Sequence, residues 1–217
     1  LVNEQRKKLS KRRDDVSMAD YRDRGYLPEA MVNYLALLGW GPADGVEIRP
    51  ISEIVDLYRL EDVNASPAFF DPKKLSHVNA EKIRGLDTEA FLAAADPFLT
   101  LGDPARHALA SLATEVQERV RTLAEVEPMI EFLVVDALAG QGPDAWVPEA
   151  RQAAVSQAAV VAGLGNAEGA PQLSKAQGPV RLAISGRSVG PPLWESLAVL
   201  GSDRTLARLR ALRTRLD

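Results

Sequence analysis

The chain has 217 residues, enough for one large domain or two smaller ones. Hydrophobic residues make up 46% of it and charged residues 26%, which is ordinary for a soluble globular protein, and the formal net charge of −4 gives no indication of nucleic-acid binding. The absence of cysteine excludes a disulfide framework and a thiolate metal site. No apolar run approaches the roughly 18 residues of a membrane span, and the basic N-terminal region is not followed by the apolar stretch of a signal peptide. We therefore expect a cytoplasmic protein that does not bind membranes.

Helix start and stop signals follow one another along the first half of the chain. Pro28 is placed at the first position of a helix and Gly39 just after its end. A short helix is predicted from Ser52. In the next helix, Asp71 is the expected N-cap and Gly85 the stop.

The second half reads in the same way, with an interruption at Pro97. Further helices are predicted at residues 87–99, 103–123, 128–135 and 148–162 and after Ser202. The segment GLGNAEGAPQLS is the best linker candidate. Only VEIRPIS and RLAIS resemble strands. The fold is predicted to be mainly α, with a boundary between Gly85 and Asp87.

The long predicted helix 103–123 has a clear apolar face, formed by Ala105, Leu109, Leu112, Val116, Val120 and Leu123. The last predicted helix has one leucine side and a neighbouring arginine stripe. Its leucines are Leu206, Leu209, Leu212 and Leu216, and its stripe contains Arg204, Arg208 and Arg215. A solvated face is the ordinary interpretation of such a stripe, with contact to phosphate as the alternative.

Positive charge is concentrated at the two ends of the chain. Six of the eight residues from Arg6 to Arg13 are basic, and five arginines follow Ser202. Such patches attract polyanions even when the net charge is negative. The ammonium and hydroxyl donors of KKLSKRR suit phosphate oxygens. Composition alone leaves three interpretations open: a solvated surface, a nucleic-acid-binding patch or a phosphate-handling loop.

The order of residues in this run is more informative. Lys8-Leu9-Ser10-Lys11-Arg12 resembles the KMSKS signature of class I aminoacyl-tRNA synthetases, in the form common to glutamyl-tRNA synthetases. The stretches that follow it, NASPAFFDPKKLSHVNAEKIR and KAQGPVRLAISGRSVGPPLWESLAVLG, are similar to two later landmarks of the bacterial enzymes. The resemblance extends from Val2 to Leu212 with its motifs in the expected order.

This resemblance implies a reaction that joins glutamate to its tRNA, with ATP and magnesium as cofactors. Lys11 would be the catalytic lysine that contacts the ATP phosphates and stabilises the departing pyrophosphate. Lys8 and Ser10 would shape the ATP-binding loop, which Leu9 and Arg12 complete. The partner would be the glutamate tRNA, and in some bacteria also the glutamine tRNA.

The resemblance also implies a division of the chain. Residues 1–16 would be a remnant of the catalytic domain that carries the signature loop. Residues 17–86 would form the connecting domain that contacts the tRNA stem. Residues 87–217 would form the α-helical anticodon-binding domain.

Important parts of a complete synthetase are absent. The two histidines, His77 and His107, form no His-x-Gly-His motif, and no Rossmann domain precedes the signature. We therefore expect the C-terminal part of a longer, monomeric enzyme, without catalysis of its own. We also expect a mobile signature loop, because its partner domain is missing and its like charges repel. The stretch between Trp146 and Lys175 is shorter than expected.

Four basic residues outside the signature are candidates for contacts with RNA: Lys73, Lys74, Arg84 and Arg187. Each has an ordinary structural alternative. The two lysines lie in the first turn of an exposed helix, where solvation is common. Arg84 can stabilise the C-terminus of its own helix, and Arg187 can brace a glycine-rich turn.

The tryptophans and histidines suggest no further site. Stacking on unpaired bases is possible for Trp40, Trp146 and Trp194, but core or half-buried packing is the commoner role. The two histidines have no metal-ligand spacing, and no metal site is predicted.

Two other functions remain open. A self-contained, non-catalytic RNA-binding module should begin with methionine and a capped first element, whereas this chain begins with Leu1 inside the run that leads to the signature. A synthetase-like enzyme that modifies a tRNA base would generally lack the helical region after residue 87.

Overall fold

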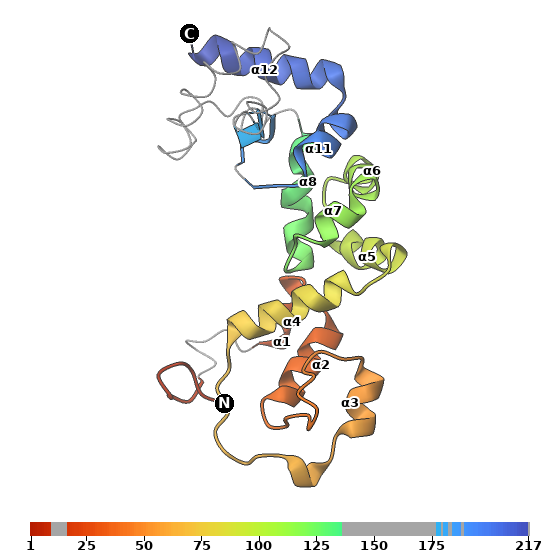
Figure 1. The fold of residues 1–217 in the computed structure, drawn as a ribbon. Coiled ribbons are helices and arrows are strands. Elements are labelled where there is room, and N and C mark those ends of the chain that lie inside the picture. The colour runs from red at the N-terminus through yellow and green to blue at the C-terminus, as the bar shows by residue number, and fades with distance from the viewer. Residues whose placement is uncertain (10–16, 136–176, 179, 182–183, 188, 217) are drawn as a thin grey trace. The chain divides into compact units, whose positions relative to one another are not determined.

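The computed structural model describes residues 1–9, 17–135, 177–178, 180–181, 184–187 and 189–216; side chains are described up to residue 211. Helices and connecting segments account for all of these residues, and no strand occurs among them (Figure 1). The predicted mainly α fold is confirmed. The chain divides into two compact units, Leu1–Phe98 with Gln117–Val126, and Leu99–Val116 with Glu127–Asp217.

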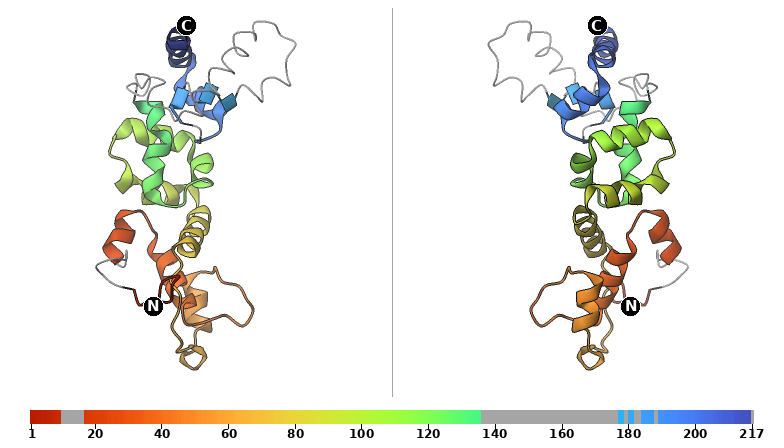
Figure 2. Two further views of the ribbon diagram at one scale, coloured as in Figure 1. Left: turned by 90° about the vertical axis from the view of Figure 1, so that its left-hand side faces the viewer. Right: turned by 90° about the vertical axis from the view of Figure 1, so that its right-hand side faces the viewer.

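The first unit is organised around the contact between two helices, α2 and α4, which lie against each other (Figure 2). Its α-helices are α1 (Met18–Asp23), α2 (Pro28–Leu37), α3 (Ile51–Leu57), α4 (Pro72–Arg84) and α5 (Thr88–Ala95). Short 3₁₀ helices are η1 (Leu60–Asp62), η2 (Asp96–Phe98) and η3 (Leu123–Glu125).

The predicted start of α4 is confirmed. The Asp71 carboxylate accepts a hydrogen bond from the backbone N–H of Lys73 at 2.8 Å, as an N-cap should. Tyr34 of α2 supports the same point: its ring meets that of Phe70 edge-on with centroids 5.3 Å apart, and its hydroxyl accepts from the Asp71 N–H at 2.6 Å. Burial raises the pKa of Tyr34. The start of α4 is thus fixed to the core of the unit.

The strand predicted for VEIRPIS does not form. Asn33 occupies the backbone groups that a strand would pair: its side chain donates to the Glu47 carbonyl at 2.7 Å and accepts from the Arg49 N–H at 3.1 Å. Pro50, which has no N–H, then precedes α3. The segment before α3 is a loop held by Asn33 and by the buried Arg49, whose guanidinium donates to the Val46 carbonyl at 2.8 Å and to the Asp44 carboxylate at 2.6 Å.

The second unit contains α6 (Asp103–Ser111), most of α7 (Ala113–Gln117), most of α8 (Val126–Val134), α11 (Leu193–Leu200) and α12 (Ser202–Leu216). The single helix predicted over residues 103–123 is wrong. The chain leaves the helical conformation at Leu112, whose φ is −130° and ψ 24°, and resumes as α7. All six residues of the predicted apolar face are nevertheless buried. The apolar spacing therefore predicted correctly which side chains are buried, but not that the helix is interrupted.

The arginine stripe of α12 is also corrected. Arg208 is only 3% exposed, whereas Leu206 is 46% exposed, the reverse of the predicted faces. Arg208 donates to the carbonyl of Ile184 at 2.6 Å and to that of Val135 at 3.2 Å. Arg204 donates to the Leu133 carbonyl at 2.6 Å. Both cations thus serve carbonyls in or just after the last turn of α8, where positive charge is favoured.

Two further predictions concern the same unit. The strand predicted for RLAIS is wrong in its described residues, because Arg181, Ile184 and Ser185 are helical. The predicted helix 148–162 and the linker candidate lie outside the described residues. Among the described helices, none combines the length and apolarity needed to cross a membrane.

Candidate nucleic-acid interface

The signature region is described only up to its second residue. Val2 exchanges backbone hydrogen bonds with the segment before α4, donating to Ala68 and accepting from Phe70, both at 2.9 Å. Val2 also faces Lys8 across a short antiparallel bridge. Lys8 is exposed and Leu9 is partly buried, whereas Ser10, Lys11 and Arg12 lie outside the described residues, as does most of the segment predicted to be mobile.

One face of α4 carries two of the residues predicted to contact RNA, Lys73 and Arg84, and two residues between them. Lys73, His77, Ala80 and Arg84 are spaced by four, three and four residues, which places them above one another on a helix. Lys74 falls on the adjacent face, where its ammonium forms an ion pair with Glu47 at 2.6 Å. The two lysines that looked equivalent in the sequence therefore have different environments.

A second segment, residues 117–121, lies along this face of α4. Gln117, which is 7% exposed, donates to the carbonyls of Ile83 and Leu86, both at 2.8 Å. Asn79 of α4 is fully buried and donates to the Arg121 carbonyl at 2.6 Å while accepting from the Leu27 N–H at 2.8 Å. These two amides attach the segment to both the middle and the end of α4.

Gly25 permits the same arrangement from the other side. It has a φ of +80°, and a β-carbon there would lie 2.5 Å from the Ala124 nitrogen. Its carbonyl accepts from the Leu123 N–H at 3.0 Å. A side chain at this position would force the backbones apart.

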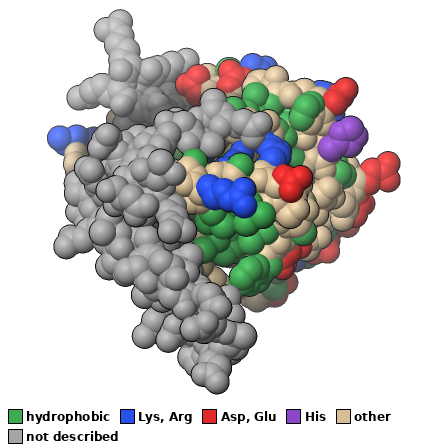
Figure 3. Space-filling view, turned by 90° about the horizontal axis from the view of Figure 1, so that it is seen from above, with side chains coloured by type: hydrophobic (Ala, Val, Ile, Leu, Met, Phe, Trp, Pro, Cys, Tyr) green, Lys and Arg blue, Asp and Glu red, His purple; other side chains and the backbone are tan. Residues whose placement is uncertain are grey.

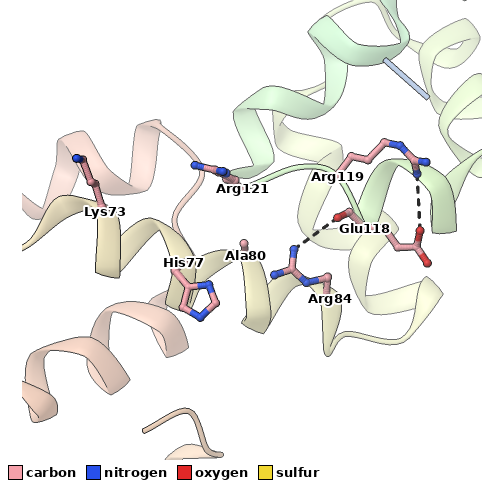
Figure 4. Close-up of a pocket in the computed structure, with 7 residues that line it drawn as sticks. All are labelled: Lys73, His77, Ala80, Arg84, Glu118, Arg119 and Arg121. Atoms are coloured by element: carbon pink, nitrogen blue, oxygen red, sulfur yellow. Dashed lines mark hydrogen bonds and ion pairs between the residues drawn. The ribbon is translucent and has the colours of Figure 1, made fainter. Parts of the chain in front are cut away.

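The result is a surface pocket with a volume of about 310 Å³, entirely within the first unit (Figure 4). It is lined by Lys73, His77, Ala80, Arg84, Glu118, Arg119 and Arg121. In this close-up Arg121 lies over α4 between the positions of Lys73 and Arg84, while Arg119 reaches toward the Glu118 carboxylate.

The charges lining the pocket are unequally paired. Arg84 forms an ion pair with Glu81 and donates to the Glu118 carbonyl at 3.5 Å. The Arg84 hydrogen bond holds the pKa of Glu81 below its ordinary value. Arg119 approaches the Glu118 carboxylate at 3.7 Å. Positive charge exceeds negative charge around the pocket, and an anionic group is the ligand that such a pocket suits.

The four residues predicted to bind RNA therefore do not form one site. Lys73 and Arg84 are brought together in the pocket and Lys74 lies beside it. Arg187 belongs to the second unit, where it pairs with Glu131 at 3.3 Å. Sequence reasoning missed Arg119 and Arg121, because a continuous helix over 103–123 would place two residues so spaced on different faces. The basic pair in ERVRTL was the available signal.

The tryptophans considered for stacking on bases differ in their exposure. Trp40 is buried at 5% exposure and its ring lies 5.6 Å from that of Tyr58, as expected for core packing. Trp194 is 54% exposed, which fits the half-buried packing expected for it, and Trp146 lies outside the described residues. Within the described part of the chain, no three His, Asp or Glu side chains gather as metal ligands.

A space-filling view from above shows a contrasting surface (Figure 3). On the described part of this face, Lys and Arg side chains border a hydrophobic patch and acidic side chains lie around it. Charges of both signs are interspersed there. This face offers less to a polyanion than the pocket does.

Comparisons with known proteins add the family context. Residues 1–77 match the family described as tRNA synthetases class I (E and Q), catalytic domain, and residues 143–213 match the anticodon binding domain family. Similar proteins include the glutamate–tRNA ligases of Thermobifida fusca, 43% identical over 97% of this chain, and Salinispora tropica, 44% identical over 100% of it. These matches cover 50% and 52% of the relatives, so the chain spans about half their length.

Solved structures show the same fold. A glutamate–tRNA ligase from Elizabethkingia meningosepticum, in complex with its amino acid, is 24% identical with a TM-score of 0.70; the match covers 99% of this chain and 50% of that one. A glutamate–tRNA synthetase from Elizabethkingia anophelis is also 24% identical, with a TM-score of 0.74 over 98% of this chain and 49% of that one.

The alignments are longer than the chain. They extend over 244 and 246 positions although the chain has 217 residues, so these relatives carry residues that have no counterpart here. The shortening predicted between Trp146 and Lys175 falls outside the described residues and stays a prediction.

Proposed function

The chain belongs to the glutamate–tRNA ligase family, and we propose that it is the tRNA-binding portion of such a ligase. The observation that carries this proposal is an identity of 43–44% to these enzymes over essentially the whole chain. The cationic pocket supports it, because excess positive charge suits contact with an extended polyanion.

The proposed division of labour follows the three predicted segments. Residues 1–16 contribute the signature loop to the ATP site, residues 17–86 contact the tRNA stem, and residues 87–217 read the anticodon. The match of residues 143–213 to the anticodon binding domain supports the last assignment. The catalytic-domain match extends to residue 77, so part of the proposed stem-contact segment accompanies the catalytic domain in the family.

ATP and magnesium belong to the proposal for the full-length enzyme. The exposed Lys8 fits contact with a phosphate oxygen, since its side chain has no partner among the described residues. Lys11 is proposed to stabilise the pyrophosphate as it leaves, and Ser10 and Arg12 to complete the loop. ATP supplies the activation of the glutamate carboxylate, and these residues only hold and stabilise its phosphates.

We further propose that the partner is the glutamate tRNA, with the glutamine tRNA as a second substrate to be tested, and that the protein is a cytoplasmic monomer. Sedimentation of the purified chain at micromolar concentration tests the oligomeric state. A concentration-dependent dimer would contradict the proposal.

The deciding experiment is a binding assay with three RNAs: the glutamate tRNA, the same tRNA with a changed anticodon, and an unrelated tRNA. Each is titrated by fluorescence anisotropy at several salt concentrations. We expect the first RNA to bind more tightly than the other two at every salt concentration. Salt weakens all electrostatic binding, so a preference that survives added salt reports recognition of the RNA itself.

Equal and weak binding of all three RNAs would contradict the anticodon assignment and favour a general basic surface. Binding that is tight but indifferent to the anticodon would favour a non-catalytic RNA-binding module derived from a synthetase. Addition of ATP and glutamate serves as the control for activity, and this chain alone is expected to form no glutamyl-tRNA.

A further inference from the structure

We infer that the pocket between α4 and residues 118–121 binds one phosphate group of an RNA backbone, and that Lys73 and Arg121 make the contact. This inference rests on the proposed function, because it names a site and a ligand group for the RNA-binding activity. It assigns the role to one predicted residue, Lys73, and to Arg121, which sequence reasoning missed.

The lining of the pocket selects an anion. Pockets for small organic ligands have volumes of roughly 300–1,000 Å³ and are predominantly apolar. This pocket has a volume of about 310 Å³, and every lining residue except Ala80 is charged or titratable. Four cationic side chains and one carboxylate, that of Glu118, contribute to it. A group with several acceptor oxygens satisfies such donors, whereas an apolar ligand would leave them desolvated.

The four cationic side chains differ in whether they already form ion pairs or hydrogen bonds within the protein. Arg84 is occupied by Glu81 and the Glu118 carbonyl. Arg119 is occupied by the Glu118 carboxylate. Lys73 and Arg121 are exposed, and neither side chain has a partner within the part of the chain that the structure describes. These two side chains are therefore the ones that a ligand can engage without breaking an existing contact.

The position of Arg121 is set in advance by its backbone. Its N–H donates to the Glu125 carboxylate at 2.7 Å, and its carbonyl accepts from Asn79 at 2.6 Å. Lys73 is set by the Asp71 cap at the start of α4. Because both backbones are fixed, binding requires only the ordering of two side chains, which keeps its entropic cost low. Asn79 is thus a positioning residue for the pocket.

The source of the phosphate is also indicated. All the charged side chains that line the pocket lie open to solvent or nearly so, and none encloses the site. A continuous RNA backbone can pass over such a pocket with one phosphate group in it. A free phosphate ion would gain little there over its hydration in water. The ligand is therefore a phosphodiester within a chain and not an isolated anion.

The test measures the salt dependence of binding to the glutamate tRNA for three variants: Lys73→Gln, Arg121→Gln and Lys74→Gln. The slope of log K against log salt is negative, and loss of one phosphate contact decreases its magnitude by about 0.7–0.9. We expect this decrease for Lys73→Gln and Arg121→Gln together with weaker binding. Lys74→Gln is the matched control: it removes the same charge one residue away, but Lys74 is paired with Glu47, so its slope should not change.

Arg121→Lys separates charge from packing, because a lysine retains the contact as a point charge and should restore most of the slope. Circular dichroism checks that each variant is folded. An NMR titration with inorganic phosphate, following the Arg121 side chain, tests the other source of the ligand.

Each remaining outcome overturns the inference. Equal slope changes in all three variants would mean that only the overall charge matters. Unchanged slopes, with anticodon-dependent binding by the unaltered chain, would show that the pocket does not contact RNA. The proposed function would be unaffected. Saturable phosphate binding that requires Arg121, combined with an unchanged RNA slope, would assign the pocket to a free anion.

Discussion

Two regions of the molecule are rich in arginine, and they use it in opposite ways. In the pocket of the first unit, the Arg121 guanidinium has no partner among the described residues, whereas the Arg121 backbone N–H and carbonyl are both hydrogen-bonded. In α12 of the second unit, Arg208 is buried at 3% exposure and its guanidinium serves two carbonyls. In the first case the basic side chain is the one that we propose to bind a phosphate group, and in the second it completes the fold. The difference arises from which atoms the surrounding structure leaves unsatisfied.

The largest effect is expected for Asn79→Ala, which removes the residue that fixes the pocket. The change leaves the Leu27 N–H and the Arg121 carbonyl without their partner, and buried unsatisfied groups cost about 1–3 kcal/mol each. We expect a loss of about 3 kcal/mol in the free energy of unfolding, measured by urea denaturation. Tight RNA binding should weaken as well, since Arg121 loses its position.

Asn64→Ala is the control, because the Asn64 side chain is exposed and, among the described residues, accepts only from the Ser66 N–H. It should change stability by about 0.5 kcal/mol or less. Similar losses for both variants would show that the buried amide does not hold the pocket together.

A somewhat smaller effect is expected for Arg208→Ala. This change leaves the carbonyls of Ile184 and Val135 without a charged donor, and such hydrogen bonds contribute about 1.5–3 kcal/mol. We expect a loss of about 2 kcal/mol in stability, with an unchanged salt slope for RNA binding. Arg210→Ala, at an exposed position of the same helix, should cost less than about 1 kcal/mol. A change in the salt slope for Arg208→Ala would contradict its structural role.

The smallest effect concerns Glu81, whose pKa is lowered by its hydrogen bond to Arg84. A lowered folded-state pKa means stability that is present above the unfolded pKa and lost as the pH falls through the folded pKa. The contribution should be below about 1 kcal/mol, because both side chains are partly exposed and solvent screens the pair. In Arg84→Gln, NMR titration should show the pKa of Glu81 moving up toward its ordinary value. An unchanged pKa would show that another group controls it.

Local signals predicted the helices well where a cap decided the outcome. Asp71, Pro72 and Gly85 bound α4 as expected, since each acts on the backbone within a few residues. The predicted continuity of residues 103–123 failed because the same apolar spacing suits two helices that change direction at Leu112.

The site could be predicted only in part. Lys73 and Arg84 were recognisable as basic residues on a helix. The role of Arg121 depends on Asn79, which lies 42 residues earlier, and that of Arg208 on Val135, which lies 73 residues earlier. No local pattern contains such pairings, because they exist only once distant backbones meet.

The return of residues Gln117–Val126 to the first unit has a consequence for synthesis. When α4 has left the ribosome, Asn79 and the carbonyl of Ile83 still lack the partners that Arg121 and Gln117 provide. The first unit therefore stays incomplete until some 40 further residues have been translated, although its helices α1 to α4 are already made. At a translation rate of about 5–20 residues per second, this delay lasts a few seconds. During that time the Asn79 side chain and the Ile83 carbonyl, which are paired in the finished unit, lack these partners.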